Sequence, residues 1–366
     1  MNNNKFSDTF FQKAILNGNN DLLNNFSQSV VERKVGGDIF FEIKSDSDHK
    51  RINNRIVKYI LSKIPVNSSA YGFIPSKSYY DFLKPHISGY YFLRLDIKKF
   101  FHSIPAVEVK NLLSQYLNDD KNGNKYSALD IAYMSVIHKV STEISDDSIN
   151  GREILPMGFS SSPSISNILF RRIDILIQKL CEEKGIIYSR YADDMLFSSS
   201  KSRYIHSEQF EKDISIFIST LSLKLKKRKR KAVENTISLN GYVIQNTRIQ
   251  KSIFNVFKEP PIGTIRLSDK KLKKLKKLSA LLRKNKRPEY IMEHLFLLNY
   301  DKFQKHYGQN TEFYIKYAND QLQHKLKGYR SYLISLIKYN DEHGCINSNC
   351  IKKAKDIVDI LELNIK

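Results

Sequence analysis

The sequence predicts an α+β protein, and three observations carry that prediction. Residues 90–95, 186–192 and 195–199 have the aromatic and β-branched composition of buried strands. Toward the C-terminal end, leucines recur at helical spacing between lysines, at Leu272, Leu275, Leu278 and Leu282. This spacing predicts a helix with an apolar stripe on one side and a cationic face on the other. The hydrophobic content of 41% is sufficient for a globular core.

The net charge points to a polyanionic partner. The chain carries 60 Lys and Arg against 38 Asp and Glu, a formal charge of +22. The excess is clustered in residues 224–231 and 270–278, and Tyr and Phe are frequent throughout. Clustered cations with aromatic side chains are typical of proteins that contact phosphates and stack bases. The alternative, that each cluster is an ordinary solvated lysine face, stays open for either cluster alone.

Membrane and cysteine signals are weak. The sequence has no apolar run of about 18 residues and no apolar region of signal-peptide type at its start, so we expect a cytoplasmic protein without membrane contact. Cys181, Cys345 and Cys350 have no Cys-x-x-Cys spacing. Neither a zinc site nor a disulfide framework is therefore predicted.

A first carboxylate stands at the end of a predicted strand. Residues 90–95 read as a buried strand that ends at Asp96, followed by a basic and aromatic helical turn with the sequence IKKFFHSI.

Further along, residues 186–192 and 195–199 form a predicted hairpin with Asp193 and Asp194 at its tip. Two adjacent carboxylates between apolar strands repel each other unless cations neutralise them. An ordinary Asp-rich turn is the alternative for this pair considered alone.

Three carboxylates at strand ends suit metal-dependent chemistry. Carboxylate oxygens are hard ligands that favour Mg²⁺ or Mn²⁺. Asp96, Asp193 and Asp194 could hold two such ions a few Å apart, the arrangement that activates a 3′-hydroxyl and neutralises a leaving pyrophosphate in nucleotidyl transfer.

Several segments together resemble a known family. YADD at residues 191–194 resembles motif C of reverse transcriptases, LDIKKFFHSI at residues 95–104 resembles their motif A, and LPMGFSSSPSISNILF at residues 155–170 resembles their motif B. Residues 70–86 resemble the fingers segment of retron and group II intron enzymes, residues 237–244 the primer-grip hairpin, and residues 325–333 a thumb helix. The resemblance covers roughly residues 50–335 in collinear order.

The resemblance implies a right-hand polymerase fold with fingers, palm and helical thumb. Residues 1–50 would be an N-terminal extension, helical near residues 8–23. Residues 51–250 would hold interleaved fingers and palm, and the antiparallel palm sheet would carry the catalytic Asp residues. Residues 251–366 would form the helical thumb and tail. The two-proline loop at residues 258–264 is the strongest boundary signal.

The resemblance also implies roles for single residues. Asp96 and Asp193 would hold both metal ions, Asp194 would support them, and the metal-binding set takes in Ile97. The nucleotide-binding set comprises Phe101 against the sugar 2′ position, Met157, Gly158, Tyr191 and Lys77. The nucleic-acid-binding set comprises Arg55, Asn240, Gly241, Tyr242, Lys270, Lys271 and Lys274. One of Lys227, Arg228 and Lys229 would supply a cation for the departing pyrophosphate. For Tyr191, a purely structural place in the core is an equal alternative.

Two departures from the family pattern stand out. Met157 occupies a position where most members have Gln, and residues 81–86 and 239–243 replace the Asn-Ala-x-x-His and Val-Thr-Gly elements of retron enzymes. The second departure argues against retron-style priming on a dedicated structured RNA, although a structured non-coding RNA stays a candidate partner.

The resulting prediction is an RNA-directed DNA polymerase that uses two Mg²⁺ ions, with an RNA template, a DNA product and deoxynucleoside triphosphates as partners. The retron-like, abortive-infection and defence-associated groups are the nearest in kind, which suggests a role in bacterial antiphage defence. Untemplated or protein-primed DNA synthesis, a catalytically silent RNA-binding scaffold, and association with itself or another protein stay open.

Overall fold

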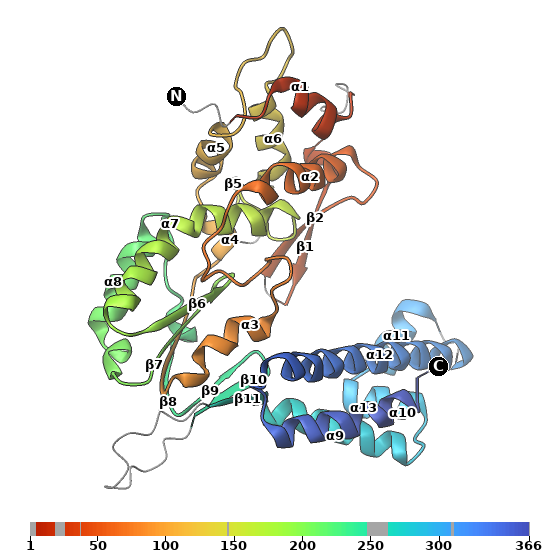
Figure 1. The fold of residues 1–366 in the computed structure, drawn as a ribbon. Coiled ribbons are helices and arrows are strands. Elements are labelled where there is room, and N and C mark those ends of the chain that lie inside the picture. The colour runs from red at the N-terminus through yellow and green to blue at the C-terminus, as the bar shows by residue number, and fades with distance from the viewer. Residues whose placement is uncertain are drawn as a thin grey trace. The chain divides into compact units, whose positions relative to one another are not determined.

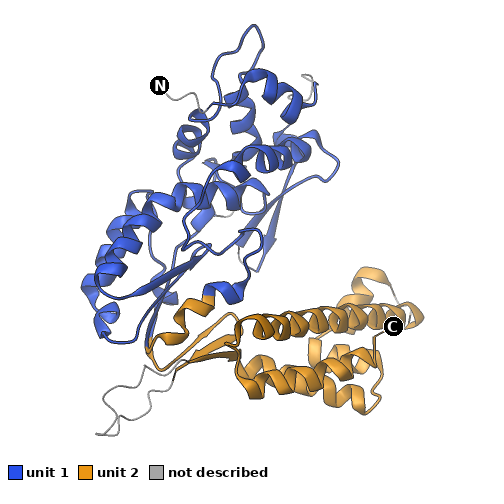
Figure 2. Ribbon diagram, viewed as in Figure 1, with its two compact units in different colours: residues 1–82, 91–232 blue, residues 83–90, 233–366 orange. Residues whose placement is uncertain are grey.

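The computed structural model describes residues 5–18, 26–36, 38–144, 146–246, 263–308 and 311–365. The chain forms two compact units (Figure 2). Unit 1 comprises Met1–Phe82 and Tyr91–Ala232, and unit 2 comprises Leu83–Tyr90 and Val233–Lys366. Strands and helices are mixed along the chain, as expected for an α+β protein (Figure 1).

The central sheet of unit 1 is antiparallel and has the order β6-β7-β3-β8. β6 (Ile187–Tyr191) and β7 (Asp194–Ser199) form the predicted hairpin, and β7 also pairs with β3 (Tyr91–Asp96). β8 (Lys231–Glu234) starts in unit 1. The two inner strands are largely buried, which explains why their sequences read as near-continuous apolar runs.

Helices cover this sheet and build the main core of unit 1. α7 (Ser161–Glu183) packs on β6 and on α8 (Glu208–Ser219). α2 (Asp48–Tyr59) packs on α6 (Ala128–Val136), which in turn packs on α5 (Ala106–Ser114). Serine caps start several of them, because a side-chain oxygen accepts a backbone N–H that the first helical turn leaves free. Ser47 caps α2, Ser207 caps α8, and Ser127 with Asp130 forms a capping box on α6.

The N-terminal segment contains more than the predicted helix. α1 (Asp8–Phe10) continues into a π-helical turn (Phe11–Leu16), while residues 19–25 lie outside the described part. A hairpin of β1 (Val30–Val35) and β2 (Asp38–Ile43) follows. Alternation in DIFFEI after a Gly-Gly pair is a hairpin signal that we did not use in the prediction.

Unit 2 combines a small sheet with long helices. β9 (Thr236–Leu239), β10 (Tyr242–Gln245) and β11 (Thr264–Leu267) form a sheet of order β11-β10-β9. Five helices follow, which are α9 (Asp269–Arg283), α10 (Pro288–Phe296), α11 (Tyr300–Tyr307), α12 (Thr311–His343) and α13 (Ser348–Glu362). On α9, Leu275, Leu278 and Leu282 are buried, as the leucine spacing predicts.

Short elements complete the described chain. They are Ser27–Ser29, Leu61–Lys63, Lys84–Ser88, Arg203–His206 and Lys227–Lys229 in 3₁₀ conformation, α3 (Tyr79–Leu83), α4 (Phe100–Ser103), β4 (His138–Lys139) and β5 (Glu153–Ile154). Of the predicted boundary loop, residues 258–262 lie outside the description. Cys181, Cys345 and Cys350 are buried and are not in disulfides. No helix in the described ranges combines the length and hydrophobicity needed to cross a bilayer.

Candidate active site

The β-sheet of unit 1 brings the three predicted carboxylates together. Asp96 is the last residue of β3 and pairs directly with Asp194, the first residue of β7. Asp193 lies in the turn between β6 and β7, and its carbonyl accepts a hydrogen bond of 3.0 Å from the backbone N–H of Ile97. The ends of two strands therefore fix all three side chains within one corner of the sheet.

The electrostatic environment of Asp193 is that of a crowded carboxylate. Burial is the main cause that raises its pKa to about 6, and repulsion from Asp96 and Asp194 raises it further. The ionised form of Asp193 is thus disfavoured until positive charge is brought close to it.

Asp96 has one oxygen engaged and one without a partner. Its carboxylate is 1% exposed, and Oδ2 accepts a hydrogen bond from Lys229 Nζ at 2.5 Å. Oδ1 is buried and has no hydrogen-bond partner among the described residues. Of the three cations that the sequence left open, the structure places Lys229 against the carboxylate cluster.

Asp194 is held by an arginine that the sequence analysis missed. Arg94 Nε and Nη2 donate hydrogen bonds to Asp194 Oδ1 at 2.9 and 2.6 Å, and Nη2 also reaches Oδ2 at 2.7 Å. Strand periodicity contained the signal, because Arg94 and Asp96 are two residues apart and so share a face of β3. This pairing fixes the Asp194 carboxylate in place from within the fold.

The donor set fits divalent cations at two of the three carboxylates. Over the described part of the chain, no group of three or more His, Cys, Asp or Glu side chains is arranged to hold a metal ion, which agrees with the engagement of Asp194 by Arg94. Asp96 and Asp193 still present carboxylate oxygens of the kind that hard cations prefer. The unpartnered Oδ1 of Asp96 is the group that a bound cation would satisfy.

A buried ion pair lies next to the turn that carries Asp193. Arg190 is fully buried, and its Nε and Nη2 donate to the two oxygens of Asp174 at 3.0 and 2.8 Å. Its Nη1 donates to Asn167 Oδ1 and to the carbonyl of Ala192. Ala192 has a φ of 57°, a left-handed conformation that non-glycine residues rarely adopt. The guanidinium thus braces a strained residue directly beside Asp193.

The segment before α3 is fastened to the same turn. Tyr71 N–H donates to Arg190 O at 2.8 Å, and Asn167 Nδ2 donates to Gly72 O at the same distance. A Cβ atom at Gly72 would come within 2.6 Å of the backbone nitrogen of Ala192. Only glycine therefore permits this approach of two backbones. Asn167 joins this segment to the turn, because its side chain is hydrogen-bonded to both Gly72 O and Arg190 Nη1.

The two adjacent phenylalanines after Asp96 have different environments. Phe100 is 4% exposed and packs on Phe170, whereas Phe101 is only partly buried. The ring of Phe101 lies 6.3 Å from that of Phe73, which is 51% exposed with a φ of 61°. Tyr191 completes this aromatic group at 6.2 Å from Phe73. Phe73 was not singled out from the sequence, and its exposure beside Phe101 makes it a candidate contact.

Met157 and Gly158 are fixed by the strand that the sequence analysis overlooked. Phe41 N–H on β2 donates to Met157 O at 2.9 Å, and a Cβ at Gly158 would lie 2.4 Å from Phe41 O. Met157 N–H donates a hydrogen bond to His102 Nε2. Burial is the main cause that lowers the pKa of His102 to about 4, and Lys99 lowers it further, so the neutral ring can accept this bond. The backbone of Phe41 therefore occupies the space that a side chain at position 158 would need. The nucleotide-binding role of Gly158 stays a prediction.

Two other predicted contacts engage the protein itself. Arg55 donates to the carbonyl of Ile15 at 3.0 Å and so ties α2 to the N-terminal helix. Lys77 is exposed, with Nζ 4.3 Å from the centre of the Tyr71 ring and 3.3 Å from Ser68 O. Arg55 and Lys77 are not hydrogen-bonded to the three carboxylates, and their roles stay predictions.

The predicted contacts of unit 2 form a separate group. Asn240 and Gly241, with φ of 46° and 91°, make the tight turn between β9 and β10, as expected of an Asn-Gly hairpin. Lys271 Nζ lies 3.7 Å from the Tyr332 ring centre and 5.3 Å from that of Tyr242, and burial lowers its pKa. Lys270 and Lys274, by contrast, are exposed on α9.

Comparison with known proteins agrees with this geometry. The family model described as "Reverse transcriptase (RNA-dependent DNA polymerase)" matches residues 44–244, which is more than half of the chain. The chain therefore belongs to the reverse transcriptase family.

Three relatives illustrate the similarity. The retron Mx65 reverse transcriptase of Myxococcus xanthus is 28% identical over 176 residues, covering 44% of this chain and 40% of the relative. The retron Ec83 and Ec86 reverse transcriptases of Escherichia coli are 30% and 26% identical over 152 and 156 residues. These cover 42% and 43% of this chain and 46% and 43% of the relatives. The chain thus spans less than half the length of these relatives.

Proposed function

We propose that this chain is an RNA-directed DNA polymerase that adds deoxynucleotides to a 3′-hydroxyl. One observation carries the proposal. In a chain of the reverse transcriptase family, Asp96 and Asp193 meet at a strand end and a turn, and Asp96 keeps one buried oxygen without a partner.

Asp96 and Asp193 are the proposed ligands of two divalent ions, with Mg²⁺ as the expected ion and Mn²⁺ as a substitute. When bound, such ions supply activation of the 3′-hydroxyl and neutralise the leaving pyrophosphate. Asp194, held by Arg94, adds negative charge to the cluster without being free to turn toward a ligand. Ile97 contributes through its backbone, which holds the Asp193 carbonyl in place.

Lys229 is the proposed cation for the departing pyrophosphate. Its ammonium group is partly exposed and is anchored on Asp96 Oδ2. A cation at the border between a buried carboxylate and solvent is placed to meet an anionic leaving group. Among the three candidates from the sequence, its contact with Asp96 supports this choice.

The polymerase subdomains follow from the same proposal. The sheet of unit 1 would be the palm, most of α2 would belong to the fingers, and the helices of unit 2 would form the thumb. The division of the chain at residues 50 and 250 remains our proposal for the subdomain borders.

Antiphage defence is the proposed biological role. The support is the similarity to retron reverse transcriptases. This is an analogy within the family, and no feature of the site carries it. A structured non-coding RNA is the partner that the same analogy suggests.

The first prediction tests the carboxylates. Asp193→Asn or Asp96→Asn should lower deoxynucleotide incorporation on a primed RNA template by about 100-fold or more, because a cation site worth several kcal/mol is lost. The melting temperature should stay the same or rise for Asp193→Asn, since one of three repelling charges is removed. Asp359→Asn, an exposed carboxylate on α13, is the matched control. Full incorporation by either site variant under Mg²⁺ would refute the mechanism.

A further inference from the structure

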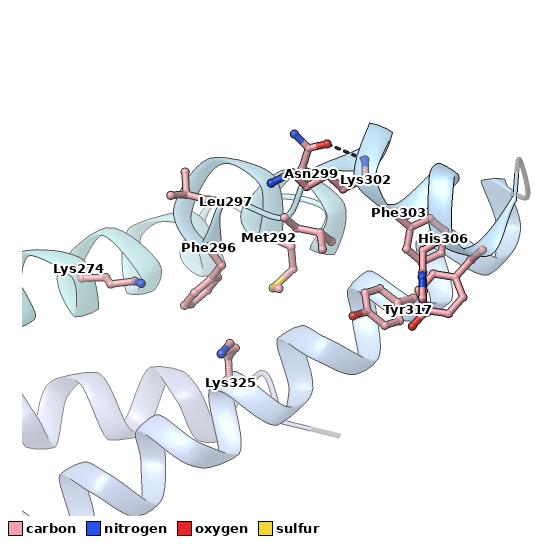
Figure 3. Close-up of a pocket in the computed structure, with 12 residues that line it drawn as sticks. Lys274, Met292, Phe296, Leu297, Asn299, Lys302, Phe303, His306, Tyr317 and Lys325 are labelled. Atoms are coloured by element: carbon pink, nitrogen blue, oxygen red, sulfur yellow. Dashed lines mark hydrogen bonds between the residues drawn. The ribbon is translucent and has the colours of Figure 1, made fainter. Parts of the chain in front are cut away.

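Unit 2 contains a pocket that the proposed chemistry does not use. It has a volume of about 470 Å³ and is formed by residues of α9, α10, α11 and α12 together with the α10–α11 connection (Figure 3). This volume is within the range of pockets that hold small ligands. We call it the α10–α11 pocket.

Two lysines from different helices lie near one aromatic ring, Phe296, at the edge of the pocket. Lys274 Nζ of α9 lies 4.7 Å from the centre of the Phe296 ring, and Lys325 Nζ of α12 lies 5.8 Å from it. Figure 3 shows both side chains directed toward Phe296. Ammonium groups are attracted by the face of an aromatic ring, but only weakly where water has access. These cations therefore remain available to a stronger anionic partner.

A second set of rings forms the other wall. The ring of Phe303 lies 5.0 Å from Tyr307 and 5.2 Å from Tyr317, and all three line the pocket. Tyr307 is 49% exposed. Aromatic rings thus line the pocket on both sides, and Tyr307 is the most exposed of them, whereas Phe303 is buried.

An exposed leucine lies at the connection between the two helices. Leu297 is 84% exposed and has a φ of 60°. A left-handed backbone costs about 1–3 kcal/mol for such a residue. Leu297 is the C-cap of α10, where its backbone N–H donates to Met292 O, and its side chain adds apolar surface to the lining of the pocket.

The charges around the pocket have one sign. Lys274, Lys302, Lys325 and His306 line it, and no carboxylate does. Within the described ranges, none of the three lysines forms an ion pair, although Lys302 N–H is hydrogen-bonded to Asn299 Oδ1. Flat rings between unpaired cations complement a ligand that has a planar apolar face and a negative group beside it.

We propose that the α10–α11 pocket binds an unpaired nucleotide of single-stranded RNA, with its base against the ring walls and its phosphates beside Lys274, Lys302 and Lys325. Every base has a π-face, so this contact tolerates any sequence, whereas the bases of a duplex are enclosed in their own stack. The choice of RNA rests on the proposed polymerase function. Binding itself needs no catalysis, so it can be measured in the Asp193→Asn chain.

Two variants separate stacking from charge. Phe296→Leu keeps an apolar side chain but removes a π-face, and should weaken binding of a labelled single-stranded RNA 12-mer by about 5- to 100-fold, since stacking is worth about 1–3 kcal/mol per base. The double change Lys274→Ala and Lys325→Ala should lower the slope of log affinity against log salt by about 1.4, because each contact to a single-stranded phosphate contributes about 0.7. Fluorescence anisotropy over a salt series measures both.

Matched controls lie on the same helices. Tyr290→Leu removes a ring of α10 that also has a lysine near it, with Lys286 Nζ at 5.4 Å, but that does not line the pocket. Lys338→Ala removes an exposed cation of α12, about 20 Å along the helix from Lys325. Both controls should bind the RNA 12-mer within about twofold of the unchanged chain.

Three outcomes would overturn the proposal. The first is an unchanged single-strand affinity in Phe296→Leu with an unchanged melting temperature. The second is an equal loss for a 12-base-pair RNA duplex, which would assign the effect to backbone contacts. The third is tighter binding of the DNA 12-mer of the same sequence, which would assign the pocket to DNA. Loss of incorporation with unchanged binding would instead concern the polymerase site alone.

Discussion

Phe100 and Phe101 are neighbours in sequence but have different surroundings, one in the core and one partly exposed. Phe100 and Phe101 point about 100° apart on a helical turn, and the structure buries Phe100 against Phe170 while leaving Phe101 partly exposed near Phe73. A ring beside the incoming sugar would exclude a 2′-hydroxyl by its volume. Selection against ribonucleotides would then come from a clash instead of from a better contact with deoxyribonucleotides.

We therefore expect Phe101→Val to raise the ratio of ribonucleotide to deoxynucleotide kcat/KM by about 10- to 100-fold. Phe100→Val is the control, and it should mainly cost stability, by about 2–4 kcal/mol in urea unfolding, because it leaves a cavity in the core. A ratio that does not move in Phe101→Val would show that another residue selects the sugar. Phe73 would then be the next side chain to change.

Arg190 acts on the site only through other residues. Its guanidinium links Asp174, Asn167 and the carbonyl of Ala192 in full burial. Removing one partner of a buried ion pair leaves the other charged and unsolvated. Arg190 is therefore expected to matter more for the shape of the turn that presents Asp193 than for any direct contact with substrate.

A double-mutant cycle measures this coupling. Arg190→Met and Asp174→Asn should each destabilise the fold, by about 3–5 kcal/mol for Arg190→Met. The pair together should cost about 1–3 kcal/mol less than the sum of the single changes. The measurement is the free energy of unfolding in urea, and additive costs would contradict the role assigned to the pair.

At the scale of elements, α9 combines two functions on opposite sides. Leu275, Leu278 and Leu282 are buried, whereas Leu272 of the predicted stripe is only partly buried. The lysines are mainly exposed, with Lys271 as the exception because it lies on the Tyr332 ring. The exposed lysines Lys270, Lys273 and Lys277 do not line the α10–α11 pocket. They can therefore be tested for duplex binding independently of that pocket.

Reversing these three charges to Glu should weaken binding of an RNA–DNA hybrid. The slope of log affinity against log salt should fall by about 2–3, since each lost phosphate contact removes slightly less than one unit. Reversal of Lys338, Lys352 and Lys355, which are exposed on α12 and α13, provides a control with the same change in net charge. If both triple variants lose the same slope, α9 is an ordinary solvated helix face.

Elements with strong periodicity could be predicted from the sequence, and contacts between distant segments could not. The β6–β7 hairpin, β3 with Asp96 at its end, and the leucine stripe of α9 agree with the prediction. The β1–β2 hairpin was missed because residues 1–50 were treated as an extension outside the fold. Its backbone turns out to hold Met157 and to occupy the space beside Gly158.

The site was predictable in its carboxylates but not in their partners. Asp96, Asp193 and Asp194 could be found because like charges at strand ends are conspicuous. That Arg94 pairs with Asp194 depends on strand register, and that Lys229 reaches Asp96 depends on a 3₁₀ turn far along the chain. The spacing of Arg94 and Asp96 predicts a shared face of β3, but it identifies neither partner.

For the whole molecule, the proposed role in defence makes a cellular prediction. Cells that express the chain together with its native neighbouring DNA should resist some phages, and cells with the Asp193→Asn version should not. The Asp359→Asn version should protect as well as the unchanged chain. Plaque counts measure this directly, and equal protection by the Asp193→Asn version would favour an RNA-binding scaffold over a polymerase.

Unit 2 includes a short segment, residues 83–90, that is synthesised well before the rest of the unit. Asn246 Nδ2 donates to Gly89 O, Gly263 N–H donates to Ile87 O, and Asn235 N–H donates to Tyr90 O. During synthesis at about 5–20 residues per second, residues 83–90 must wait on the order of 10–30 s for these partners to leave the ribosome. During that interval the unit 1 residues on either side of the segment can fold. The carbonyls of Ile87, Gly89 and Tyr90 still lack these hydrogen-bond donors. Dividing the gene at the border near residue 232 would therefore leave unit 1 complete but would separate residues 233–366 from residues 83–90, which belong to the same unit.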